Sequence, residues 1–169
     1  ARELNYISDV DVVYVVAPVE PAAAGAAPHA GAEGESAPLK LTENECSTIG
    51  TELVHALTRA IMGPAPEPAL WEVDANLRPE GKDGPLVRTV ESYVQYYKRW
   101  AENWEFQALL KARPIAGSAQ LGARYARAID PFVWESAGRE SFVESVQAMR
   151  ARVTDNIPSH QVDRQIKLG

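Results

Sequence analysis

The sequence predicts an α+β protein in which a small α/β core is followed by a helical region. Two segments, 10–16 and 70–77, have the residue patterns of β-strands and carry acidic side chains. A helical pattern lies between them, and from residue 89 onward apolar residues recur at helical spacing. We therefore divide the chain into an α/β core at 1–88 and a helical region at 89–169.

Composition and charge narrow the class of protein. The chain has 169 residues, 46% hydrophobic and 24% charged, and a net charge of −6, which is typical of a globular protein. The negative charge argues against a broad nucleic-acid surface, and no apolar run approaches the roughly 20 residues of a membrane span. Cys46 is the only cysteine, so no internal disulfide is possible and a reducing, cytoplasmic location is expected.

The first predicted strand begins with two carboxylates. Residues 10–16 are mostly β-branched and apolar, and Asp9 and Asp11 stand two residues apart at their start. Side chains alternate along a strand, so both carboxylates project from one face. Two like charges side by side are costly unless a cation lies between them, and Mg²⁺ suits carboxylate oxygens. The alternative interpretation is a pair of solvated side chains at a strand end.

The segment after this strand and the next helix follow from composition. Residues 18–38 are almost entirely Ala, Pro, Gly and Glu, so we expect a mobile surface insert. Thr42 and Glu45 have the spacing of a capping box, which predicts a helix over 42–62. Its apolar stripe, expected to face the core, consists of Ile49, Leu53, Leu57 and Ile61.

The second predicted strand supplies a third carboxylate. Residues 70–77 alternate strictly between apolar and polar, with Asp74 central on the polar face. Beside a strand carrying Asp9 and Asp11, Asp74 would complete a three-carboxylate cation site. Taken alone, Asp74 is better interpreted as a solvent-facing polar residue of a half-buried strand. A turn-rich loop follows, in which Arg78 and Lys82 are placed to meet phosphate oxygens.

Three further helices are expected in the second region. Thr89 can cap a helix whose aromatic stripe, expected to pack in the core, consists of Tyr93, Tyr97, Trp100 and Trp104 and reaches Ala108. Another follows Ser118 and is expected to end at Asp130-Pro131, and the last begins at Ser141 with Glu144 as its capping partner.

Four segments resemble one known family, the bifunctional glutamine synthetase adenylyltransferase/adenylyl-removing enzymes. They are residues 3–11, which end in Ser-Asp-x-Asp, residues 73–87, residues 104–113 and residues 166–169. The family belongs to the nucleotidyltransferase superfamily that includes DNA polymerase β. The resemblance implies a mixed sheet with flanking helices, followed by a helical region.

The resemblance also implies a reaction. The family has two homologous catalytic halves: the first removes AMP from a glutamine synthetase tyrosine by phosphorolysis, giving ADP, and the second attaches AMP from ATP. Glu3-Leu4-Asn5-Tyr6 and the closing Ile166-Lys167-Leu168-Gly169 resemble the first half, so we expect the adenylyl-removing reaction. The alternatives are ATP-dependent adenylylation and a non-catalytic regulatory module that docks a partner.

Site residues carried over from the family define the expected chemistry. Asp9 and Asp11 would hold Mg²⁺ against the phosphates, and Asp74 would complete a second metal position and help to activate the tyrosyl hydroxyl in the forward reaction. The candidates for phosphate or nucleotide contacts are Ser8, Arg78, Lys111 and Arg113. For the three cationic side chains a structural salt bridge is the alternative, and Lys111 and Arg113 also suit a helix C-terminus.

The expected partners are adenylylated glutamine synthetase, phosphate with ADP or ATP, and a PII signalling protein, with no nucleic acid and no membrane. The family's Gly-rich turn before Arg2 and its Gly-Gly segment after Gly169 are missing, so we expect a fragment of a longer enzyme.

Overall fold

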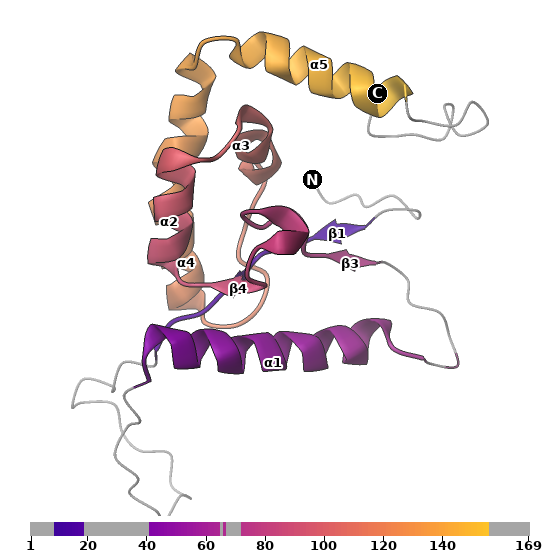
Figure 1. The fold of residues 1–169 in the computed structure, drawn as a ribbon, viewed down its shortest axis with the longest axis vertical. Coiled ribbons are helices and arrows are strands. Elements are labelled where there is room, and N and C mark those ends of the chain that lie inside the picture. Colours follow the sequence, from indigo (N-terminus) through magenta and orange to yellow (C-terminus); the bar gives the residue numbers. More distant parts are fainter. Residues whose placement is uncertain (1–8, 19–40, 65, 67–71, 156–169) are drawn as a thin grey trace, which may run out of the picture.

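The computed structural model describes residues 9–18, 41–64, 66 and 72–155, and shows an α+β protein with short parallel strands (Figure 1). Some expectations fall outside these residues. They concern Ser8 and the rest of the first family-like segment up to residue 8, almost all of the 18–38 insert, and the last family-like segment from residue 166. Among the helices in the described part of the chain, none combines the length and hydrophobicity needed to cross a membrane.

Two parallel strand pairs form the α/β part. β1 (Val10–Asp11) pairs with β3 (Val73–Asp74), so the expected strand neighbours are confirmed. β2 (Tyr14–Val15) pairs with β4 (Val87–Arg88). The run predicted as one strand is therefore divided in two, because it changes its hydrogen-bonding neighbour after Val12, whose amide still bonds to Asp74.

The first helix, α1 (Glu43–Met62), begins as predicted. Thr42 and Glu45 form a complete capping box, in which each side chain accepts the other residue's backbone N–H. Gly63 caps its C-terminal end by donating its N–H to the Arg59 carbonyl. In Figure 1, α1 runs beneath β4, to which it is packed.

The buried face of α1 differs from the expected one. The stripe of Ile49, Leu53, Leu57 and Ile61 is exposed, and the side facing the strands carries Cys46, Gly50 and Val54. The small residues decide the orientation, because they allow the closest approach of the backbone. A Cβ built on Gly50 would lie only 3.0 Å from Cγ1 of Val87 on β4.

The predicted aromatic helix is two helices, α2 (Val90–Arg99) and α3 (Asn103–Leu109). The start at Thr89 is confirmed, since its hydroxyl accepts the Ser92 N–H. The break occurs because Glu102 is extended and forms a capping box with Glu105, which starts a new helix. As a result Trp100, Trp104 and Ala108 are exposed rather than packed in the core.

Two longer helices follow in the part of the chain that the structure describes. α4 (Ala119–Glu135) starts after Ser118 as predicted but continues through Pro131, past the expected end. The continuation is supported by burial of Val133 and by the Trp134 indole, which donates to Asp130 across the proline. A short 3₁₀ turn, η2 (Ser136–Gly138), leads to α5 (Phe142–Asp155). α5 begins one residue after Ser141, whose φ of 59° is left-handed.

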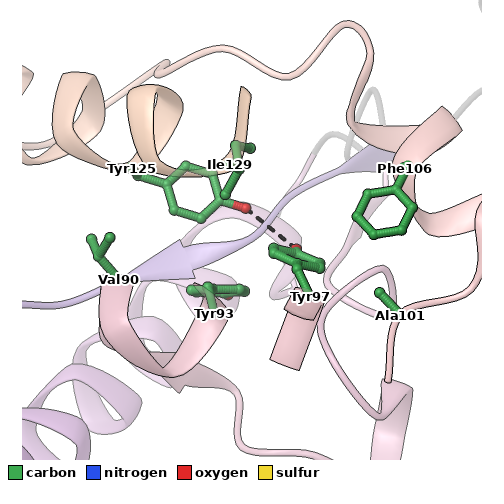
Figure 2. Close-up of a cluster of buried hydrophobic side chains, with 7 residues drawn as sticks. All are labelled: Val90, Tyr93, Tyr97, Ala101, Phe106, Tyr125 and Ile129. Carbon is green, nitrogen blue, oxygen red and sulfur yellow. Dashed lines mark hydrogen bonds between the residues drawn. The ribbon is translucent and has the colours of Figure 1, made fainter. Parts of the chain in front are cut away.

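The main core joins α2, α3 and α4. It consists of Val90, Tyr93, Tyr97, Ala101, Phe106, Tyr125 and Ile129 (Figure 2). The hydroxyls of Tyr97 and Tyr125 lie 3.5 Å apart, and Tyr93 donates to the Tyr14 carbonyl of β2 at 3.2 Å. Val13 and Val15 pack against this cluster, so packing connects the strand segment to the helical region across the expected boundary at 88/89. That domain division stays a prediction.

Candidate functional site

The register of β1 and β3 assembles three carboxylates. Asp11 lies directly opposite Asp74, and the amides of Val10 and Val12 hold the pair through 2.7 Å bonds to the carbonyls of Glu72 and Asp74. Asp9 precedes Asp11 by two residues. One carboxylate oxygen from each of the three aspartates lies within 4.8 Å of the others. The sequence therefore predicted this juxtaposition correctly.

The three carboxylates have the chemistry of a site for a hard divalent cation. Asp9 and Asp11 are exposed and Asp74 is half-buried, so a bound ion could keep water ligands on its open side. Asp74 is held by a local hydrogen bond, because the backbone amide of Asn76 donates to its Oδ1 at 2.7 Å. Oxygen-only ligands favour Mg²⁺ over softer transition metals.

The loop between β3 and β4 is wound around Arg78. Its Nη1 donates to the Ala75 carbonyl at 2.8 Å and its Nε donates to the Gly84 carbonyl at 3.1 Å. Its Nη2 reaches the carbonyl of Lys82, within the 3₁₀ turn η1 (Gly81–Asp83), at 3.3 Å. The guanidinium thus lies inside the loop that follows Asp74, while the Lys82 side chain is exposed.

A second set of contacts fixes the outside of this loop. Glu80 has a left-handed φ of 63°, and its carboxylate accepts a 2.6 Å bond from Arg88 on β4. Arg88 also donates to Ser92 on α2. Sequence reasoning did not identify Arg88, because no spacing rule connects a residue of one strand to a turn eight positions earlier.

Glu105 connects α3 to the same loop. Its carboxylate accepts the Tyr96 hydroxyl at 3.1 Å and the Glu102 backbone amide at 2.9 Å, and the nearby Glu80 backbone lowers the pKa of Tyr96. Burial raises the pKa of the Glu105 carboxyl, and the bonds from Glu102 and Tyr96 oppose that rise. Burial likewise raises the pKa of Tyr96, and the Glu105 charge adds to the effect. Glu105 belongs to a family-like segment, but the sequence did not indicate its contact with Tyr96.

The remaining phosphate-binding candidates are less closely tied to the carboxylates. Lys111 and Arg113 are exposed and follow the last residue of α3, on a different element from the three aspartates. Of the four candidates, the structure attaches Arg78 to the carboxylate strand through its loop, and Ser8 is outside the described residues. The roles of all four in phosphate binding stay predictions.

Comparison with known proteins identifies the family. The family model for glutamate-ammonia ligase adenylyltransferase matches residues 1–128. The chain is 54% identical over its full length to a bifunctional glutamine synthetase adenylyltransferase/adenylyl-removing enzyme from Leifsonia xyli subsp. xyli, of which it covers 15%. It is 50% identical over 99% of its length to the protein of that name from Streptomyces coelicolor, again covering 15%.

A third relative agrees. The protein of the same name from Corynebacterium glutamicum is 47% identical over the whole chain, which covers 13% of it. The chain thus spans about one seventh of the length of the curated relatives it matches. A family match over residues 1–128 and full-length identity near one half lead to one conclusion. The chain belongs to the glutamate-ammonia ligase adenylyltransferase family.

Proposed function

We propose that this chain is a catalytic unit for Mg²⁺-dependent nucleotidyl transfer that controls the adenylylation of glutamine synthetase. The observation that carries the proposal is the cluster of Asp9, Asp11 and Asp74, with oxygens within 4.8 Å of one another. The family membership supports glutamine synthetase as the protein substrate, since the matched relatives are named for it.

The three carboxylates fit a divalent cation because they converge from two paired strands and offer oxygen ligands only. A bound Mg²⁺ would supply neutralisation of the charge on the phosphoryl oxygens. Asp11 would hold it from β1, Asp9 from the position just before β1, and Asp74 from β3. Nucleotidyl transfer asks little covalent chemistry of a protein, so holding the attacking and leaving oxygens in line is the main task of the site.

We propose the direction of the reaction as removal of AMP. An oxygen of inorganic phosphate attacks the phosphorus of the AMP group on the glutamine synthetase tyrosine. The bond from phosphorus to the tyrosyl oxygen breaks, that oxygen takes up a proton, and ADP is the product. The resemblance of Glu3-Leu4-Asn5-Tyr6 to the adenylyl-removing half supports this direction over attachment of AMP from ATP.

The test replaces the carboxylates in the full-length enzyme. Asp9→Asn and Asp11→Asn should each abolish phosphate-dependent ADP formation from adenylylated glutamine synthetase, because the metal loses a charged ligand. ATP-dependent adenylylation, assigned to the other half, should persist. Asp83→Asn is the matched control, since Asp83 is an exposed carboxylate of η1 that does not belong to the cluster.

The outcomes separate the alternatives. Loss of attachment with retained removal would place this chain in the adenylylating half. Survival of both activities in both variants would show that the cluster is not the catalytic metal site and would favour a regulatory module.

A further inference from the structure

We infer that Arg78 is a positioning residue that shapes the loop after β3 and thereby fixes Asp74, rather than a direct ligand of substrate phosphate. The inference rests on the proposed metal site and adds a residue that acts on that site through the backbone. Three hydrogen bonds from one guanidinium to the carbonyls of Ala75, Lys82 and Gly84 carry it.

These three carbonyls come from the start, the central turn and the end of the loop. Ala75 directly follows Asp74, whereas Gly84 lies three residues before β4. One planar side chain therefore ties the start of the loop to its end and to the intervening turn. Only Arg has donors in a rigid fork that can reach three acceptors at once, and a Lys ammonium cannot reproduce that geometry.

The rest of the loop is built around the same centre. Pro79, next to Arg78, is fully buried, and a Cβ at Gly84 would lie only 2.1 Å from the Pro79 carbonyl. Glu80 and Gly81 both have positive φ, at 63° and 56°. A backbone this tightly constrained has few alternative conformations, so loss of its central hydrogen bonds cannot be compensated by a small adjustment.

Asp74 depends on this loop because its strand is short. β3 has only two residues, and beyond them the Asp74 carboxylate is oriented by the Asn76 amide. Arg78 holds the Ala75 carbonyl, which lies between Asp74 and Asn76. The turn set by Arg78 thus determines where the Asn76 amide points and, through it, where the third carboxylate lies.

Positioning and plain electrostatics predict opposite changes in metal affinity. A cation near three carboxylates disfavours a second cation, so removing its charge should tighten Mg²⁺ binding if Arg78 acts only through charge. If Arg78 positions Asp74, removing it should weaken binding. Outer groups that orient metal ligands typically contribute about 10- to 100-fold in affinity.

The experiment is a calorimetric Mg²⁺ titration of the chain without nucleotide. We expect Arg78→Ala and Arg78→Lys each to weaken binding about 10-fold, the second despite its conserved charge. Lys82→Ala is the matched control, because it removes an exposed cationic side chain from the same loop. The Mg²⁺ affinity of this variant, measured without nucleotide, should be unchanged or slightly tighter than that of the wild type. Binding by Arg78→Ala as tight as the wild type, or tighter, would overturn the inference.

Hydrogen exchange gives a second readout that does not require metal. The amides of Gly81, Asp83 and Gly84 bond within the loop and should exchange faster in Arg78→Lys, while those of α2 stay protected. Protection of the loop amides in Arg78→Lys equal to that in the wild type would contradict the inference. Loss of protection throughout α2 would also contradict it, because Arg78 would then determine the whole fold. If the wild-type chain binds no Mg²⁺, the proposed function fails, and loop exchange alone decides the role of Arg78.

Discussion

Glu105 is a carboxylate held almost out of water, with 6% of its surface exposed. Its two hydrogen bonds, from the Tyr96 hydroxyl and the Glu102 amide, favour the charged form, but desolvation outweighs them and raises its pKa. Glu45 in the capping box of α1 is the opposite case, because the amide and hydroxyl of Thr42 lower its pKa.

These directions predict opposite dependences of stability on pH. A carboxyl whose pKa is raised by folding stabilises the protein below its unfolded pKa, and that contribution is lost as pH rises through the folded pKa. We therefore compare the free energy of unfolding of Glu105→Gln with that of the wild type at each pH. The difference, variant minus wild type, should be more positive at pH 7 than at pH 4. Glu45→Gln should show the reverse, since the contribution of Glu45 is present above its unfolded pKa and lost as pH falls.

Urea titrations at the two pH values measure both effects. The two glutamine variants serve as controls for each other, because both remove a carboxyl that accepts backbone and side-chain bonds. Parallel changes in the two variants would mean that the burial of Glu105 does not govern its titration.

At the scale of single elements, α1 shows that apolar spacing alone does not choose the buried face. Leu53 is 65% exposed, whereas Val54 beside it is 7% exposed and lies toward the strands. Val54→Ala should lower the free energy of unfolding by about 2 kcal/mol, because it removes two buried carbons and leaves a cavity. Leu53→Ala should change it by less than about 0.5 kcal/mol.

Chemical unfolding of the two adjacent variants measures the difference directly. Since both changes lie in the same helix, helix propensity favours alanine in each, and burial is the main difference between them. A larger loss for Leu53→Ala than for Val54→Ala would show that the Ile49–Ile61 stripe is a packed face of the isolated chain.

The features of the helices that the sequence predicted correctly are those that depend on local interactions. Thr42, Thr89 and Ser118 predicted helix starts correctly, because a cap bonds to amides within three residues. The orientation of α1 was wrong, because it depends on Val87, far along the chain from Gly50. The break before α3 was also missed: apolar spacing continues across it, and only the extended backbone of Glu102 interrupts it.

The same distinction applies to the candidate site. The Asp-x-Asp pair and the alternating second strand were sufficient to predict that three carboxylates converge. The hydrogen-bond partners of Arg78 could not be predicted from the sequence, because a cation after an acidic strand suits phosphate and backbone carbonyls equally well. The structure shows that its guanidinium donates to three backbone carbonyls.

At the scale of the whole molecule, the proposed metal site lies where the two short strands β1 and β3 pair. β1 and β3 share two register pairs, and three like charges converge where they meet. A cation that binds only the folded chain stabilises it by about 2.7 kcal/mol at 100 times its dissociation constant. Mg²⁺ should therefore raise the melting temperature of this chain.

Thermal unfolding in Mg²⁺ and in chelator tests this coupling. Asp11→Asn should melt at or above the wild-type temperature in chelator, because one of three crowded charges is removed, and should lose the response to Mg²⁺. Asp83→Asn, which keeps the cluster, should respond like the wild type. An equal Mg²⁺ response in all three proteins would show that the ion binds elsewhere.

The parallel pairing of β1 with β3 also determines when the site can exist during folding. Asp11 and Asp74 are 63 positions apart in the sequence, and no local turn can bring them together. The chain must close a long loop that contains α1 for the carboxylates to meet, and because such closure is entropically costly we expect this contact to form late in folding. A ligand whose binding site is absent from the folding transition state slows unfolding and leaves the refolding rate unchanged. We therefore expect Mg²⁺ to slow the unfolding of the folded chain without speeding its folding.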